Sequence, residues 1–365
     1  MKRETLLENG YRHRALSLSY RMAARWALIA AVLLPQAALA KPLAREILAE
    51  MPFNHGQIQG VLDGKLVTSE VVEVSERELG AAVACLVPPG RKGSLEFARN
   101  NRVTMPDEYK DTAGPIDPAD IEGSLAALNL GGKKREARRY LEIEPGFDIN
   151  LSKEEIAAFR ALAPAKGEEL AAVEAKLREV FAQRIRSYRA RGLDGIAPFA
   201  RGDEKAKGGS PAGDLRRATD AAGAFRKLMP EYYEALLAYP TKSNAPNGRE
   251  FLFWSRIQVL GRPVFMLHQR LTAAAEHAEI IVERQFYASH FLNVGQVLIG
   301  LLPVQEGTLA FYVNRTWVDK WHGFGTGAKR AIGKKIVRDV IKDLADHFDL
   351  CKGLPRVDPP GEEVR

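Results

Sequence analysis

A serine and a histidine are neighbours in the stretch RQFYASHFLNVGQ, residues 284–296. A serine hydroxyl becomes a nucleophile when a histidine accepts its proton, so the pair raises the question of hydrolytic chemistry. The stretch has the pattern of a β-strand, in which neighbouring side chains point to opposite faces. We therefore expect that Ser289 and His290 do not hydrogen-bond to each other. A hydrolase that used His290 or His268 would need a nucleophile from elsewhere, and the sequence contains no GxSxG turn.

The same alternation places polar side chains where they could orient a small ligand. Tyr287 and Ser289 share the more polar face of one strand, and Tyr312 and Asn314 share a face of another. The alternative is an antiparallel sheet with one solvated face. The candidate ligand-binding residues are Tyr287, Ser289, His290, Tyr312, Asn314 and Arg315.

Arg315 stands out because it lies between two apolar residues that share its strand face. A guanidinium there fits a carboxylate or phosphate of a ligand. It also fits a structural ion pair with Asp319 or Glu283, which is what a buried arginine usually needs, and we favour this second interpretation.

The N-terminus has the pattern of a secretory signal peptide. Arg25 precedes an apolar run over residues 26–34, and Ala38-Leu39-Ala40 forms a small-residue cleavage site. We expect cleavage after Ala40 and a periplasmic or secreted protein. Met22 begins a complete signal by itself and is a second candidate start. No other segment is apolar enough to span a membrane.

Charge and motifs argue against several classes of protein. The formal net charge is +7, but residues 1–40 hold six Lys/Arg and only two Asp/Glu, so most of the excess is in the leader. A nucleic-acid partner is therefore not expected. The basic face of residues 329–342 allows peripheral contact with a membrane, or is a solvated helix face. No paired-carboxylate, HExxH, Walker or Rossmann signature occurs, so no metal or cofactor is predicted.

Two cysteines, Cys85 and Cys351, leave two alternatives. An oxidising compartment would permit a disulfide between them. Cys85 also lies in an apolar run, where a buried free thiol is equally expected.

Hydrophobic periodicity predicts an α+β chain of strands, helices, strands and a final helix. A hairpin is expected over residues 57–74 around Asp63-Gly64, and a strand over 78–88. The mature chain, residues 41–365, is expected to form a single domain. It comprises N-terminal strands and a loop (41–117), a helical segment (118–240), an antiparallel meander with a C-terminal helix (241–350) and a tail (351–365). The meander strands are expected at 251–260, 263–272, 279–289, 294–302 and 308–317, and the final helix at 325–349.

This element order resembles the helix-grip fold of START-like (SRPBCC) proteins. The resemblance implies a curved antiparallel sheet that grips a long C-terminal helix, with a helical segment inserted between strands and a ligand pocket beneath the helix. The stretches FLFWSRIQVLGRPVFMLHQ, QFYASHF and GTLAFYVNRTWVDKWHGFGTGAKR also resemble an uncharacterised family of exported bacterial proteins. That second resemblance implies no catalytic residues.

The sequence thus favours an exported protein that binds an apolar or amphipathic, lipid-like small molecule in a cavity between sheet and helix. Two alternatives remain: a periplasmic hydrolase that uses His290 or His268, and an envelope scaffold or interaction module built on the helices of residues 118–240.

Overall fold

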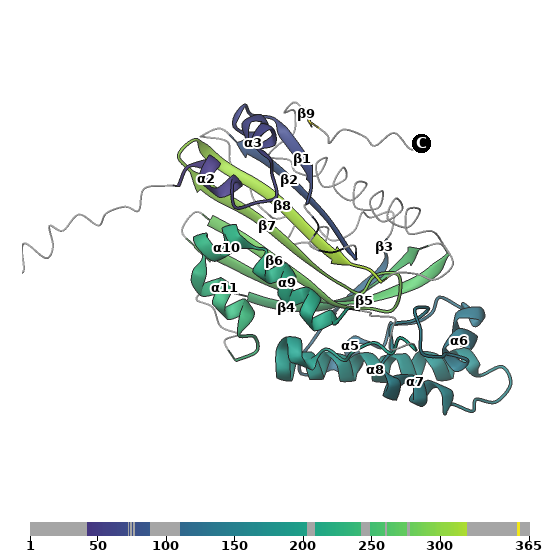
Figure 1. Ribbon diagram of the computed structural model, residues 1–365. Coiled ribbons are helices and arrows are strands. Elements are labelled where there is room, and N and C mark those ends of the chain that lie inside the picture. Colours follow the sequence, from purple (N-terminus) through teal and green to yellow (C-terminus); the bar gives the residue numbers. More distant parts are fainter. Residues whose placement is uncertain are drawn as a thin grey trace, which may run out of the picture. The chain divides into compact units, whose positions relative to one another are not determined.

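An antiparallel β-sheet organises the chain (Figure 1). The computed structural model describes residues 42–71, 73, 75, 77–87, 110–202, 209–241, 249–259, 261–275, 278–319 and 356–357. The predicted signal peptide, the predicted helix 325–349 with its basic face 329–342, and Cys351 lie outside the described residues.

The sheet has the strand order β3-β4-β5-β6-β7-β8-β2-β1-β9. Every neighbouring pair is antiparallel except β1 and β9, which are parallel. The five strands β4 to β8 form the predicted meander, and the α+β class is confirmed. The strands are β1 (Leu66–Glu70), β2 (Glu78–Val87), β3 (Lys110–Ile116), β4 (Arg249–Val259), β5 (Arg262–Ala275), β6 (Ala278–Ala288), β7 (Val294–Val304), β8 (Gly307–Trp317) and β9 (Arg356–Val357).

The helices of the described residues precede β1 or lie between β3 and β4. Ser152 and Glu155 form the capping box of α7, and Gly192 ends α8 with φ 59°. Pro230 begins a new helix, α11, where the missing N–H is tolerated. The helices are α2 (Ala44–Leu48), α3 (His55–Leu62), α5 (Ile121–Ser124), α6 (Lys134–Leu141), α7 (Lys153–Arg160), α8 (Glu169–Arg191), α9 (Pro211–Asp220), α10 (Gly223–Leu228) and α11 (Pro230–Leu237), with a 3-10 turn at Gly192–Gly195.

The hairpin predicted over residues 57–74 is wrong, because its first half is helix α3. Asn54 caps this helix. Its side-chain oxygen accepts from the Gln57 backbone N–H, and the Gln57 side-chain oxygen accepts from the Asn54 backbone N–H. Ile58 and Val61 bury its apolar face. The Asp63-Gly64 turn therefore joins a helix to a strand.

The two faces of the sheet have different neighbours. We call one the helix face, because its side chains pack against the described helices; it includes Trp254, Phe265, Val282, Leu298 and Phe311. We call the other the opposite face. Residues directly across antiparallel strands share a face, so the register assigns to it Ser255, Met266, Ile281, Ile299, Tyr312 and Val83.

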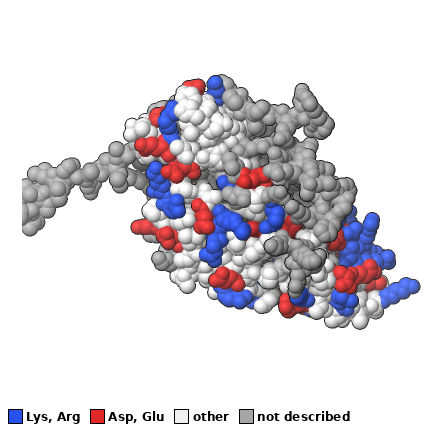
Figure 2. Space-filling model, viewed as in Figure 1, with Lys and Arg blue, Asp and Glu red and all other residues white. Residues whose placement is uncertain are grey.

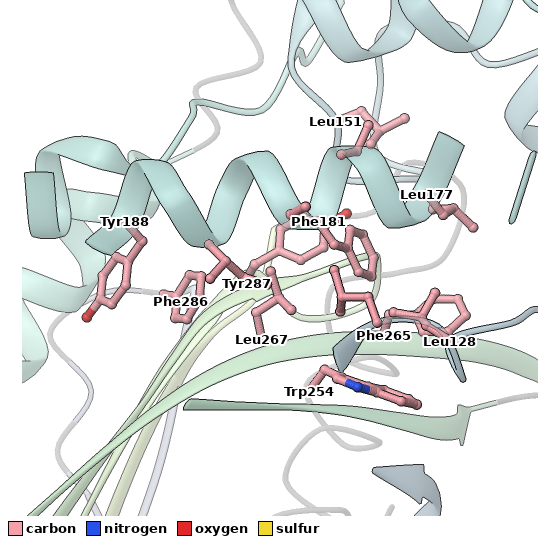
Figure 3. Close-up of a cluster of buried hydrophobic side chains, with 14 of the residues drawn as sticks. Leu128, Leu151, Leu177, Phe181, Tyr188, Trp254, Phe265, Leu267, Phe286 and Tyr287 are labelled. Atoms are coloured by element: carbon pink, nitrogen blue, oxygen red, sulfur yellow. The ribbon is translucent and has the colours of Figure 1, made fainter. Parts of the chain in front are cut away.

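Helix α8 covers one end of the helix face (Figure 3). Phe181 meets Phe265 and Tyr287 edge to face, with ring centroids 5.8 and 5.3 Å apart, and Tyr188 stacks on Phe286 at 4.1 Å. Such pairs add to the stability gained from burying the rings. Helices α2, α3, α10 and α11 pack on the other end, and α9 contacts β6 and β7 between them. This layer holds the sheet in one register.

A β-bulge interrupts strand β6. Leu267 pairs with Tyr287 and His268 pairs with Gln285, so Phe286 is an extra residue without a partner. Phe286 and Tyr287 consequently both contact α8. Alternation before the bulge is undisturbed, which leaves Glu283 on the opposite face.

Candidate functional site

A serine, a histidine and a glutamate from three adjacent strands meet on the opposite face. The hydroxyl of Ser255 in β4 lies 2.9 Å from Nε2 of His268 in β5. On the other side of the ring, Nδ1 lies 3.1 Å from Oε1 of Glu283 in β6, at ion-pair distance but without hydrogen-bond alignment. We call Ser255, His268 and Glu283 the triad. All three are buried.

Sheet register explains why these residues meet. Ser255 lies opposite Met266, and Glu283 lies opposite Arg270. His268 is therefore the diagonal neighbour of both on the same face, within reach of side chains of this length. The triad is thus a consequence of strand pairing.

Two further side chains fix the triad. The ring of Phe253, directly opposite His268, stacks on the imidazole at 4.4 Å with an interplanar angle of 2°. Arg270 donates to Oε2 of Glu283 from Nη2 (2.6 Å) and Nε (3.0 Å). Because Arg270 engages Oε2, Oε1 is the oxygen left toward His268.

The charges around Glu283 keep it ionised. Burial opposes ionisation, but the charge of Arg270 and the contact with His268 outweigh it and lower the pKa of Glu283 to about 2. A carboxylate beside Nδ1 favours the imidazole tautomer with its proton on that nitrogen. Nε2 then has a lone pair directed at Ser255. This is the arrangement in which a histidine can accept a serine proton.

The surroundings of the triad are apolar on one side and polar on the other. Next to Ser255, the residues Ile257, Val264, Met266 and Ala288 form a small apolar cluster. Toward β8 lies Tyr312, fully buried, with a hydroxyl that has no hydrogen-bond partner among the described residues. Burial first, and then the charge of Glu283, raise the pKa of Tyr312. An orphaned buried hydroxyl is costly and marks a place where a polar group could bind.

The expectation that Ser289 and His290 are not hydrogen-bonded is wrong. Ser289 Oγ lies 2.9 Å from His290 Nδ1. Alternation does not apply, because β6 ends at Ala288 and the chain bends, with φ 63° at Phe291. Ser289 Oγ also accepts from the backbone N–H of Phe265. His290 Nε2 has no hydrogen-bond partner among the described residues, so this pair has no orienting carboxylate.

The structure separates the other predicted ligand-binding residues. Tyr287 faces α8, because the bulge reverses its side, and Arg184 lies 4.2 Å above its ring. Arg315 is on the helix face and forms an ion pair with Glu78; the predicted partners Asp319 and Glu283 are wrong. Tyr312 and Asn314 are on the opposite face with the triad. Hence only these two share a surface with His268.

The helix face carries a second polar network. Arg77 bridges Asp214 (2.6 Å) and Asp319 (3.2 Å), and Arg201 pairs with Asp319. These contacts tie α9 and the chain after β8 together. A hollow beside Met51 and Gln296 has a volume of about 20 Å³, which admits about one water molecule. Neither feature offers room for a ligand.

Neither surface charge nor metal-ligating residues indicate a second site in the described ranges. Acidic and basic side chains are interspersed on the face in Figure 2. Among the described residues, no group of three or more His, Cys, Asp or Glu could hold a metal. No helix in the same part of the chain has the length and apolarity to cross a membrane.

No protein-family model and no curated protein matches the chain. The triad is therefore interpreted from its geometry.

Ser255, Glu283 and Arg270 are the residues that the sequence analysis did not assign to a site. A signal for Ser255 was available. Val259 and Arg262 pair across the turn at Gly261, and counting back along both strands places Ser255 diagonal to His268.

Proposed function

We propose that this protein binds an apolar or amphipathic, lipid-like small molecule against the opposite face of the sheet. The observation that carries the proposal is the Tyr312 hydroxyl, buried and unpartnered among the described residues, in a face that also bears the triad. A binding face of this kind combines an extensive apolar surface with a few polar groups that fix orientation.

The apolar part of the ligand would lie on the centre of the sheet. Ile281, Val297, Ile299 and Val83 are buried side chains of this face on neighbouring strands. Each fully buried aliphatic side chain is worth about 1.5–3 kcal/mol when shielded from water. The polar end of the ligand would reach Tyr312 and Asn314 on β8, which strand β7 separates from Glu283.

The strand order supports a START-like arrangement. The first long strand, β2, lies next to the last, β8, and β3 is at the far edge. The helices between β3 and β4 lie on the helix face, which leaves the opposite face for the predicted helix 325–349. We propose that this helix covers the ligand, and that export places the protein in the periplasm or outside the cell.

Two measurements test the proposal. Purified protein extracted into organic solvent should release a lipid-like molecule at near-stoichiometric amount by mass spectrometry. A fluorescent fatty-acid analogue should then bind the extracted and refolded protein. Loss of one neutral hydrogen bond corresponds to about 1 kcal/mol, so Tyr312→Phe should weaken binding about five-fold.

Tyr188→Phe is the matched control. It removes the same hydroxyl from a fully buried tyrosine, which donates to Gln269 (2.6 Å) on the helix face. Its affinity for the analogue should equal that of the wild type. No extracted lipid together with no binding of the analogue would reject the proposal.

The scaffold alternative receives no comparable support. The exposed large hydrophobic residues in the described ranges are Leu43 and Phe251, and neither lies within residues 118–240. An interaction surface usually presents a contiguous apolar patch.

A further inference from the structure

We propose that Ser255, His268 and Glu283 act as nucleophile, general base and orienting carboxylate, and that they hydrolyse an ester bond of the molecule bound on the opposite face. This inference rests on the proposed binding function for its substrate class. The assignment of the three catalytic roles does not depend on the binding function, because it is argued from the distances within the triad.

The comparison with the second serine–histidine contact supports the assignment. Ser289 and His290 approach equally closely, at 2.9 Å, and are equally buried. That imidazole has no carboxylate at its other nitrogen among the described residues. A serine nucleophile requires its base to be oriented by a third group, and His268 has one.

Neighbouring side chains also restrain the triad. The Phe253 ring fixes the plane of the imidazole, and two hydrogen bonds from Arg270 fix Glu283. A catalytic group must be held close to its productive geometry, and neighbouring side chains supply that restraint. Phe253 and Arg270 are accordingly positioning residues.

The reaction balances without any further cofactor. Ser255 Oγ bonds to the ester carbonyl carbon while its proton passes to His268 Nε2. The bond from that carbon to the alcohol oxygen breaks, and the alcohol leaves with the proton. Water then gives a proton to Nε2, and its oxygen bonds to the acyl carbon. The acyl–serine bond breaks, and Oγ recovers the proton.

The residues around Ser255 indicate the acyl part of the substrate. Met266 lies directly opposite, and Ile257 and Val264 continue the same face. The acyl chain is therefore expected to be apolar, and p-nitrophenyl esters of medium or long chains should be cleaved faster than the acetate.

A small fluorophosphonate provides a direct test, because it bonds covalently to an activated serine. The purified protein should gain the mass of one adduct, and peptide mapping should place it on Ser255. Loss of a general base slows such a step by about 100-fold or more, so His268→Ala should label at that reduced rate. Glu283→Gln should reduce the rate and change its pH profile.

Ser289→Ala is the matched control, since it removes the other histidine-paired hydroxyl. It should label like the wild type, with thermal unfolding used to check that each variant is folded. The test does not require a folded Ser255→Ala variant, because peptide mapping locates the adduct in the wild-type protein.

The two proposals fail in different ways. Binding of the fatty-acid analogue without labelling of Ser255 would overturn the hydrolase and leave the binding function intact. Labelling of Ser255 without lipid binding would support the hydrolase and reject the binding function. An adduct on another serine, or equal labelling of His268→Ala, would also overturn the hydrolase.

Discussion

Phe253 and His268 lie directly opposite each other on β4 and β5, and their rings stack in nearly parallel planes. Arg270, two residues along β5, places its guanidinium carbon 5.1 Å from the same phenyl ring. One aromatic side chain therefore restrains two of the polar groups around Glu283.

Replacing Phe253 by alanine should destabilise the protein and loosen the triad. The ring is buried, and removal of a buried phenyl group costs about 3–5 kcal/mol. We expect this loss in denaturant titrations, with slower fluorophosphonate labelling of Ser255. Phe251→Ala is the comparison, because that ring stacks on Phe253 but is 38% exposed and should contribute less. Equal losses for both variants would contradict the role assigned to Phe253.

Glu283 should make stability fall in acid. Its pKa is about 2 in the folded protein and about 4.5 in the unfolded chain, so its contribution is complete above pH 4.5 and disappears toward pH 2. Between pH 5 and pH 3 the wild type should lose roughly 2 kcal/mol more than Glu283→Gln. Glu144→Gln, at an exposed ion pair with Arg160, should behave like the wild type. A wild type that loses no more than Glu283→Gln would refute this prediction.

His290 should destabilise the fold as it becomes protonated. Burial, and then the charges of Arg262 and Arg139, hold the pKa of His290 well below its usual value. Unfolded chains take up this proton near pH 6.5, so stability is lost as the pH falls below that value, by at most about 1.4 kcal/mol per pH unit.

Unfolding titrations from pH 7 to pH 5 would measure this slope. We expect it to be shallower in His290→Asn, which retains a polar atom near the position of Nδ1. His55→Asn serves as the control, since His55 is exposed on α3. An unchanged slope in His290→Asn would show that another group is responsible.

Cys85 should be joined to Cys351. Cys85 is fully buried in β2, and no free thiol is present in the described ranges. The chain has one other cysteine. Peptide mapping without reductant should therefore recover both cysteines in one linked fragment, which separates on reduction. Recovery of either cysteine as an alkylated single peptide before reduction would disprove the link.

The sequence predicted the meander well because each of its strands has a clear boundary. Gly261 adopts φ 76° at the β4–β5 turn, and Gly307 begins β8 after another turn. Val173, Leu177 and Phe181 of α8 follow one another at four-residue spacing, as on one face of a helix, and all three are buried. These features depend on residues close together in the sequence, so the periodicity of apolar residues is enough to predict them.

The candidate site was harder to predict, because it depends on pairing between strands. His268 was singled out as a possible base, but its partners required the register of two hairpins. The bulge at Phe286 made the predicted face of Tyr287 wrong. The sequence does not show where a strand contains an extra residue. The bend after Ala288 likewise brought Ser289 and His290 together against expectation.

The extra residue at Phe286 also divides β6 into two parts that evolution can alter separately. Upstream of it, insertions or deletions would shift Glu283 relative to His268 and abolish their contact. Deletion of Phe286 itself would restore regular alternation: Tyr287 would stay opposite Leu267 and the ladder from Ala278 to Gln285 would stay in place, but the stack of Phe286 on Tyr188 would be lost. Relatives that differ in length at this point should therefore keep the carboxylate while their aromatic contacts with the long helix diverge.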